Sequence, residues 1–262
     1  MAFTLATWNI NSVRLREGLV ARLMADEAPD ILCLQECKSP VELIPMEQFN
    51  ALGYGHVVAR GQKGYNGVAI LSKLPLEDMG HRDFAAMGHA RHVAARLPNG
   101  VVIHNCYIPA GGDIPDREVN AKFGQKLDWV AELRDWGHAE RPERSILVGD
   151  LNIAPREDDV WNHRQLLKIV SHTPVETELL LDAQAAGRWV DVTRQDIPGG
   201  PLFSWWSYRS PDWDGADKGR RLDHVWATPD IAGAAHSSRI LRAARGWDQP
   251  SDHAPVFATF DL

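Results

Sequence analysis

Short apolar runs rich in β-branched residues recur along the chain, and several are separated by stretches with apolar residues at helical spacing. The runs predict strands at residues 3–10, 30–36, 67–73, 92–97, 101–108, 145–153, 222–228 and 256–262. The helical spacing predicts helices over residues 13–26, 120–136 and 176–187. Asn99-Gly100 predicts a hairpin turn between two of the strands.

The order of these elements indicates the fold class. Strands joined by hairpins are mixed with strands separated by helices, which favours an α/β fold of two packed sheets with helices outside over a purely parallel βαβ arrangement. No fixed-period repeat and no low-complexity linker interrupts the sequence. We therefore expect a single domain over residues 1–262.

Composition narrows the class of protein. The 44% hydrophobic and 24% charged residues are typical of a soluble globular protein. No apolar run reaches the length of a membrane span, and the N-terminus lacks the basic and apolar segments of a signal peptide. Three cysteines argue against a disulfide framework. We expect a cytoplasmic protein with no membrane partner. The net charge of −7 is mild evidence against nucleic-acid binding, unless a site collects carboxylates to hold a metal.

Polar residues gather where the predicted strands end or begin. They are Asn9 and Asn11, Gln35 and Glu36, Asn105 and Tyr107, Asp150 and Asn152, Asp223 and His224, and Asp252 and His253. Any one of them is explained as well by a turn, a helix cap or a solvated strand end. Six such coincidences favour one shared rim, because strand ends in a layered sheet converge and ligands bind there.

The chemistry of this set points to phosphate esters. Carboxylates and amides, without a cysteine or histidine cluster, suit magnesium, manganese or calcium better than zinc. The remaining acid, amides and imidazole suit positioning of a water and stabilisation of phosphate charge. The sequence has no serine or cysteine nucleophile signature and no GxxxxGK[ST] loop. Metal-assisted hydrolysis of a phosphate ester is therefore expected.

The motifs around these residues resemble those of the exonuclease III family of DNA-repair nucleases, within the endonuclease/exonuclease/phosphatase superfamily. They are TWNINSVR (7–14), LCLQECK (32–38), GYNGVAILSK (64–73), NCYIPAGG (105–112), VGDLNIAP (148–155), FSWWSYR (203–209), RRLDHVW (220–226) and PSDHAPV (250–256). The resemblance implies a deoxyribonuclease I-like four-layered α/β sandwich. It also implies 3′-5′ exonuclease, 3′-phosphatase, 3′-phosphodiesterase and abasic-site endonuclease activities.

The resemblance also implies a role for each matching residue. Glu36 is the expected principal ligand of Mg²⁺, for which Mn²⁺ substitutes, with Asn9 and Asp252 at the same metal site. The expected catalytic residues are Tyr107, Asp150, Asn152, Asp223 and His253. Within that set, Asp150 orients or deprotonates the attacking water, and Asp223 is the carboxylate partner of His253. Asn11 falls where relatives carry an acid or an amide.

The expected partner is double-stranded DNA with 3′ ends, nicks or abasic sites, bound by a monomer. Candidate DNA contacts are Arg91, Lys122, Trp205, Arg209 and Arg221, with Arg220 and Lys38 as further basic candidates. Trp205 and Trp206 lie in the motif that would shape the sugar pocket, where one of them is expected to stack. For each basic residue alone, a solvated surface charge is as good an explanation. Phosphate contacts would provide most of the affinity.

Two stretches depart from the family pattern. Ala110 stands where some relatives place a polar residue, and the segment after GDLNIAP carries His163 and His172. That segment is expected to reshape the abasic pocket, which makes 3′-end processing the firmer expectation. The alternatives are a phosphatase or phosphodiesterase of the same superfamily acting on inositol phosphates or lipids, and a binding module with an inactive site.

Overall fold

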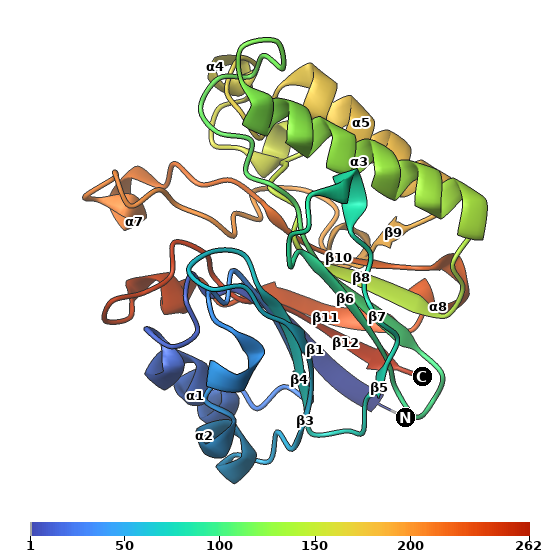
Figure 1. Ribbon diagram of the computed structural model, residues 1–262. Coiled ribbons are helices and arrows are strands. Elements are labelled where there is room, and N and C mark those ends of the chain that lie inside the picture. Colours follow the sequence, from blue (N-terminus) through green and yellow to red (C-terminus); the bar gives the residue numbers. More distant parts are fainter. Residues whose placement is uncertain (1) are drawn as a thin grey trace.

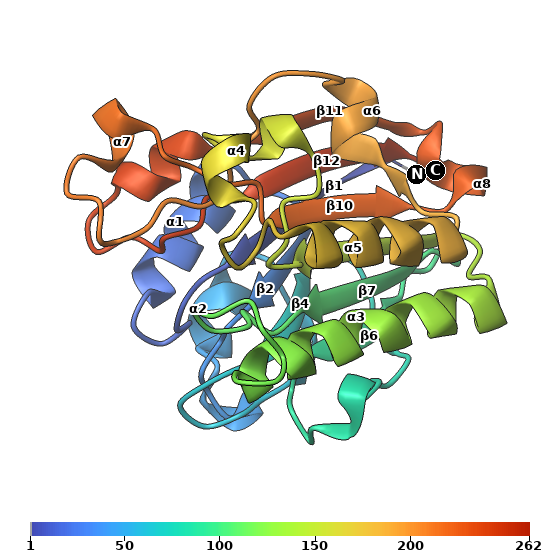
Figure 2. The same cartoon turned by 90° about the horizontal axis from the view of Figure 1, so that it is seen from above.

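Two six-stranded sheets pack face to face in the computed structural model, which describes residues 2–262 (Figures 1 and 2). The first sheet has the order β11 (Ala235–Ile240), β12 (Val256–Asp261), β1 (Ala2–Asn9), β2 (Ile31–Gln35), β4 (Val68–Ser72) and β3 (His56–Arg60). The second has the order β5 (Glu77–Asp78), β6 (His92–Arg96), β7 (Val102–Tyr107), β8 (Ser145–Asp150), β10 (Asp223–Ala227) and β9 (Val190–Asp191).

Helices cover the outer face of each sheet. The first sheet carries α1 (Glu17–Asp26) and α2 (Met46–Ala51), and the second carries α3 (Ala121–Glu140) and α5 (Pro174–Ala186) (Figure 1). Shorter helices lie in the connections: α4 (His163–Leu166), α6 (Val192–Asp196), α7 (Trp213–Ala216), α8 (Pro229–Ala232) and the 3₁₀ turns at Val41–Leu43, Phe84–Ala86, Glu157–Asp159 and Arg242–Gly246. Within residues 2–262, no helix is long and apolar enough to cross a bilayer.

The three largest parts of the core correspond to the three contacts between the four layers. The central part lies between the sheets and includes Leu5 and Ile31 from one sheet and Val148 and Val225 from the other. A second part packs α1 and α2 on the first sheet, and a third packs α3 and α5 on the second. The predicted four-layered α/β sandwich is therefore confirmed.

The predicted elements are largely present, with differences at their ends. The helix predicted from residue 13 begins at Glu17, because Ser12 has a φ of 88° and the chain turns there. The turn at Asn99-Gly100 joins antiparallel β6 and β7, and Gly100 takes the φ of 85° that such a turn needs. The strands not predicted were β3, β5, β9 and β11, which are short or lie at sheet edges and have weak alternation.

Strand register explains why distant residues meet. β1 and β2 run parallel, as do β7 and β8, so each pair ends at the same edge. Tyr107 pairs with Asp150, and the antiparallel β10 places Asp223 opposite Asp150 as well. β12 begins beside the end of β1, where Val256 pairs with Thr7. The exits of four strands and the entrances of two therefore lie at one end of the sandwich, opposite the chain termini (Figure 1).

A buried polar network ties the two sheets together below this rim. Gln35 Nε2 lies 2.7 Å from Asn105 Oδ1 and 2.9 Å from Thr7 Oγ1. The amide of Asn105, on β7, donates across the interface to the carbonyls of Leu34 and Ala69, at 3.0 and 2.9 Å. Asn105 was among the polar residues that suggested a functional rim, but its side chain forms the hydrogen bonds that join the two sheets.

We predict that Asn105→Ala lowers the free energy of unfolding by about 3 kcal/mol, because buried polar groups in both sheets lose their partners and a void remains. Chemical denaturation measures the change. Thr259→Val is the control, since it removes a hydrogen bond to Thr4 that is only partly buried. The control should cost less than about 1 kcal/mol, and equal losses in the two variants would contradict the assignment.

Candidate active site

A cleft of about 880 Å³ opens at the end of the sandwich where these strands meet. Seven of the residues predicted from the sequence as catalytic or metal-binding line it: Asn9, Glu36, Tyr107, Asp150, Asn152, Asp252 and His253. They come from both sheets and from the loops that follow or precede their strands. Asp223 lies directly behind the lining, in contact with His253.

His253 is held between two carboxylates at the base of the cleft. Its Nδ1 lies 2.8 Å from Asp223 Oδ2, and its Nε2 lies 3.7 Å from Asp150 Oδ2. Burial disfavours the charged ring, but the charges of Asp223 and then Asp150 outweigh it and raise the pKa of His253 to about 10. These charges favour the imidazolium form, with the Nδ1 N–H donated to Asp223 and Nε2 beyond hydrogen-bond distance of Asp150.

Ser204 fixes the carboxylate behind the ring. Its hydroxyl donates to Asp223 Oδ2 at 2.7 Å and accepts from the backbone N–H groups of Leu222 and Asp223, each at 3.0 Å. The Ser204 carbonyl accepts from the N–H of Ala254, the residue after His253. Ser204 was not predicted. Its only sequence signal is its place in the FSWWSYR motif, where the tryptophans drew attention first.

Asp150 is oriented by amides on two sides. Asn9 Nδ2 donates to Asp150 Oδ2 at 2.8 Å, while Asn152 donates from its backbone at 2.9 Å and from its side chain at 3.0 Å. Burial raises the pKa of Asp150, and the charge of His253 and the Asn9 hydrogen bond partly offset it. Gly149 is required beside it, because a Cβ there would lie 1.9 Å from the carbonyl oxygen of Cys106.

The oxygen ligands suited to a metal are those of Glu36 and Asp252, which line the same cleft, and of Asn11 beside them. Lys38 Nζ lies 2.9 Å from Glu36 Oε1 and 2.7 Å from Asn11 Oδ1, so a cation already bridges two of these oxygens. The Asn11 amide also donates to Asp252 Oδ1 at 3.3 Å. Carboxylate and amide oxygens gathered around a positive charge fit a hard divalent cation. Lys38, considered as a phosphate contact, is engaged with these acceptors instead.

The residues predicted to bind DNA are found in different environments. Trp205 and Arg209 line the cleft, as does Arg220, whose guanidinium lies 5.1 Å from the centre of the Trp205 ring. Arg91 stacks on Tyr107 with its guanidinium 4.6 Å from the ring centre. Lys122 is exposed in the first turn of α3 and does not line the cleft. Trp206 is a core residue.

The prediction that Arg221 binds DNA is wrong. Its side chain is 1% exposed and pairs with Asp159 at 2.8 Å and Asp191 at 2.7 Å. Arg194 pairs with Asp159 as well. A buried guanidinium held by the buried Asp159 and the partly exposed Asp191 cannot reach a phosphate, so Arg221 stabilises the loop that leads into β10.

The segment after GDLNIAP forms part of the cleft wall, but not through its histidines. Trp161, Ile169, Val170 and Ser171 line the cleft. His163 and His172 hydrogen-bond to each other behind this wall at 2.9 Å, and His172 Nδ1 lies 2.6 Å from the Ala154 carbonyl oxygen. Trp161, and Lys218 beside it, also line the cleft and had no local sequence signal.

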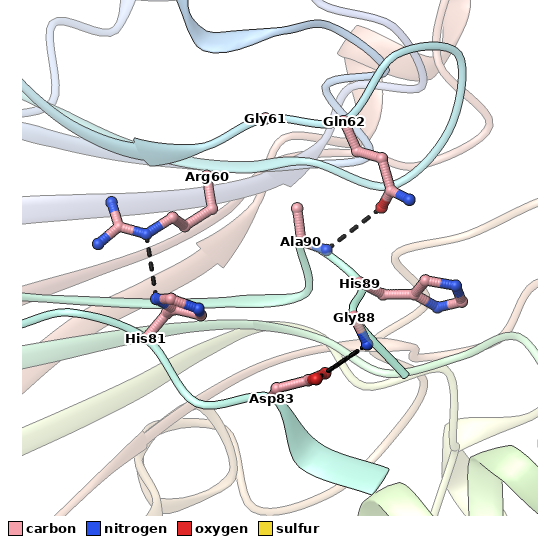
Figure 3. Close-up of a pocket in the computed structure, with 8 residues that line it drawn as sticks. All are labelled: Arg60, Gly61, Gln62, His81, Asp83, Gly88, His89 and Ala90. Carbon is pink, nitrogen blue, oxygen red and sulfur yellow. Dashed lines mark hydrogen bonds between the residues drawn. The ribbon is translucent and has the colours of Figure 1, made fainter. Parts of the chain in front are cut away.

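A second cavity, of about 270 Å³, shares no lining residue with the cleft (Figure 3). Several of its polar groups are already paired: Arg60 Nε donates to His81 Nδ1, the Ala90 N–H to Gln62, and the Gly88 N–H to Asp83. This internal pairing leaves few groups to bind a ligand, and we assign no chemistry to this cavity.

The layered fold with a polar cleft at its strand ends defines the class, an α/β sandwich of the deoxyribonuclease I type. The chain belongs to the Endonuclease/Exonuclease/phosphatase family, whose model matches residues 6–253. It is 29% identical over 268 residues to the exodeoxyribonuclease III of Haemophilus influenzae, covering 97% of this chain and 98% of that protein.

Solved structures agree with this assignment. An AP endonuclease from Archaeoglobus fulgidus matches with a TM-score of 0.92 at 31% identity, over 99% of this chain and 100% of that one. A 3′ phosphatase, NExo, from Neisseria, bound to a product DNA hairpin, matches with a TM-score of 0.90 at 32% identity and the same coverage. The predicted family is thereby confirmed.

We predict that Asp223→Asn lowers the pKa of His253, because burial remains while the nearest opposing charge is lost. NMR titration of the imidazole ring measures this. In the wild-type protein, folding raises the pKa of His253 from 6.5 to about 10. The ion pair with Asp223 therefore stabilises the fold fully below pH 6.5, and this stabilisation is lost as the pH rises towards about 10. The wild type should thus exceed the variant in unfolding free energy by more at pH 6 than at pH 10. Identical His253 titrations in both proteins would contradict the pairing.

Proposed function

We propose that this protein is a divalent-metal-dependent DNA-repair nuclease that hydrolyses phosphodiesters and phosphomonoesters at 3′ ends and cleaves 5′ to abasic sites. One observation carries the proposal: Asp150 and His253, with Asp223 behind the ring, share a single cleft with the carboxylates of Glu36 and Asp252. The family membership and the names of the relatives support the same reaction. A superfamily phosphatase for inositol phosphates or lipids is the less favoured alternative.

Asp150 is the proposed base for the attacking water. Its carboxylate is fixed by Asn9 and Asn152, so the water it binds has one defined direction of approach. A buried carboxylate with a raised pKa is a better proton acceptor than an exposed one, since general bases work best when their pKa is near the working pH. The proton taken from the water then resides on Asp150.

His253 and Tyr107 are the proposed donors to the phosphate oxygens. His253 would offer a charge-assisted N–H through Nε2, while Asp223 keeps the ring charged and oriented. Burial, with added charge from Glu36 and Asp150, holds the pKa of Tyr107 well above its ordinary value, so the phenol keeps its proton to donate. Donors fixed before the reaction stabilise the charge that develops in the transition state.

Glu36 and Asp252 would hold the metal, with Asn11 beside them, and we propose Mg²⁺, for which Mn²⁺ can substitute. When bound, the metal offsets negative charge on the phosphate. Magnesium needs only one or two protein carboxylates and keeps positions for water and phosphate, which suits this small set. Lys38 would have to release Glu36 or Asn11 as the metal enters.

Arg209 is the proposed contact to DNA phosphates, with Trp205 stacking on an unpaired sugar or base. Arg220 lies beside them and would contact a phosphate through the N–H groups that it does not donate to Val170 and Ser171. All three line the cleft. Arg91 and Lys122 would contact the backbone further along the duplex. We propose that the protein acts as a monomer on 3′ ends, nicks and abasic sites. The three cysteines are buried and unpaired, in keeping with the reducing conditions of the cytoplasm.

The decisive experiment compares an abasic duplex, a duplex with a 3′-phosphate, a recessed 3′ end and an inositol phosphate, each with Mg²⁺ and with EDTA. We expect hydrolysis of the DNA substrates in Mg²⁺ and its loss in EDTA. The 3′-end substrates should be preferred, because the segment with Trp161 and Val170, which line the cleft, departs from the family pattern. Preference for the inositol phosphate, or turnover that survives chelation, would overturn the proposal.

Asp150→Asn should lower kcat on the recessed 3′ end by at least about a thousandfold, because the amide cannot accept a proton from water. DNA binding and the fold should be retained, as judged by fluorescence anisotropy and circular dichroism. Asp182→Asn, on the exposed face of α5, is the control and should leave kcat unchanged. If the Asp150 variant turns over at a near-normal rate, another group is the base.

A further inference from the structure

Lys126 and Glu176 form an ion pair with both side chains 0% exposed, between α3 and α5. Removing two charges from water costs several kcal/mol per ion, and the mutual attraction alone often fails to offset it. Neither side chain lines the cleft or touches the Asp223–His253–Asp150 array. What the pair contributes is therefore found in its other hydrogen bonds.

The Lys126 ammonium hydrogen-bonds to the two segments that follow β7 and β8 and line the cleft. Besides Glu176, its Nζ donates to the carbonyl of Asn152 at 2.8 Å and to that of Ala110 at 3.3 Å. Asn152 carries the amide that orients Asp150. Ala110 follows Tyr107 by three residues and lines the cleft. The three N–H groups of the ammonium are thus fully used, two of them on exits of neighbouring strands.

The Glu176 carboxylate holds the facing wall. Its oxygens accept from the N–H of Ser171 at 2.9 and 3.0 Å, from the N–H of Thr173 at 3.2 Å and from the Thr173 hydroxyl at 2.6 Å. Ser171 has a φ of 87°, an uncommon conformation that these bonds help to maintain. Ser171 and its neighbour Val170 line the cleft, so the carboxylate, together with Arg220, which donates to the Val170 carbonyl and the Ser171 hydroxyl, fixes this part of the wall.

We propose that Lys126 and Glu176 are positioning residues that set the distance between the hydrolytic group on β8 and the cleft wall at residues 169–171. Neutral residues of the same shape would fill the space. They could not, however, donate to two backbone carbonyls on one side and accept from two backbone N–H groups on the other. This inference rests on the proposed nuclease activity for its kinetic readout. Its structural readout is independent of that activity.

The test is the double variant Lys126→Met/Glu176→Gln, which removes both charges together and so leaves no isolated buried ion. The control is Arg194→Met, which breaks a comparably buried pair with Asp159, a carboxylate that keeps Arg221 as a partner. Rates are measured with Mg²⁺ on a recessed 3′-end duplex at a temperature where circular dichroism shows all proteins folded. We expect kcat of the double variant to fall about a hundredfold with KM changed less than about threefold, since a misplacement near 1 Å costs that much. The control should keep kcat within about twofold, even with a lower Tm.

Glu176→Gln alone is the second variant, in case the double variant does not fold. It keeps the shape and one of the two acceptor oxygens, but its amide nitrogen cannot accept from the donors around it and Lys126 loses its counter-ion, so a loss of at least about tenfold in kcat is expected. Hydrogen exchange provides the readout that needs no substrate: amides at residues 150–153 and 169–173 should exchange faster than in Arg194→Met. Wild-type kcat together with unchanged exchange in these variants would overturn the inference. An inactive wild type would instead refute the proposed function. The exchange data would still decide whether Lys126 and Glu176 hold residues 150–153 and 169–173 in place.

Discussion

The hydrogen bond from Asn9 to Asp150 joins the two sheets at the one place where chemistry is proposed. Asn9 ends β1 of the first sheet and Asp150 ends β8 of the second, so their 2.8 Å contact exists only if the sheets pack with those ends flush. The buried contact of Gln35 with Asn105 enforces that alignment from below. A slip of one residue in either sheet would turn these side chains away from each other. The site therefore depends on inter-sheet register more than on any single loop.

The chain turns sharply as soon as it leaves these strands, and the turns carry the functional side chains. Asn11, Glu36, Lys38 and Asn152 all have φ between 49° and 54°, a left-handed conformation that non-glycine residues rarely take. Each costs on the order of 1 kcal/mol, which the packed sandwich must offset. In return, Glu36 and Lys38 direct their side chains to the same oxygen cluster although one buried residue separates them. The strain is thus located where side-chain direction matters most.

The sequence was informative about strand ends and poor about buried charge. Polar residues that close apolar runs, such as Glu36 and Asp150, were recognisable because their place in the pattern is local. Arg221 and Lys126 were not, since an isolated basic residue in a sequence is most often on the surface. Their partners, Asp159 and Glu176, are 62 and 50 positions away, and only the tertiary structure brings them together. Asn105 illustrates the opposite error. It is a polar residue near a strand end that was interpreted as part of the functional rim, but its amide forms hydrogen bonds between the sheets.

The net charge of the whole chain does not describe the surface that a nucleic acid would meet. Several acids are paired with a cation, Glu36 with Lys38 near the surface and Asp223, Glu176 and Asp159 inside the protein with His253, Lys126 and Arg221. Arg209, Lys218 and Arg220 line the cleft itself and oppose its remaining carboxylates. A bound divalent cation would add two positive charges at the Glu36 side and shift the local balance towards attraction of phosphate. The potential that DNA meets is set by this local arrangement, because charges more than a Debye length away, about 8 Å at physiological salt, are largely screened.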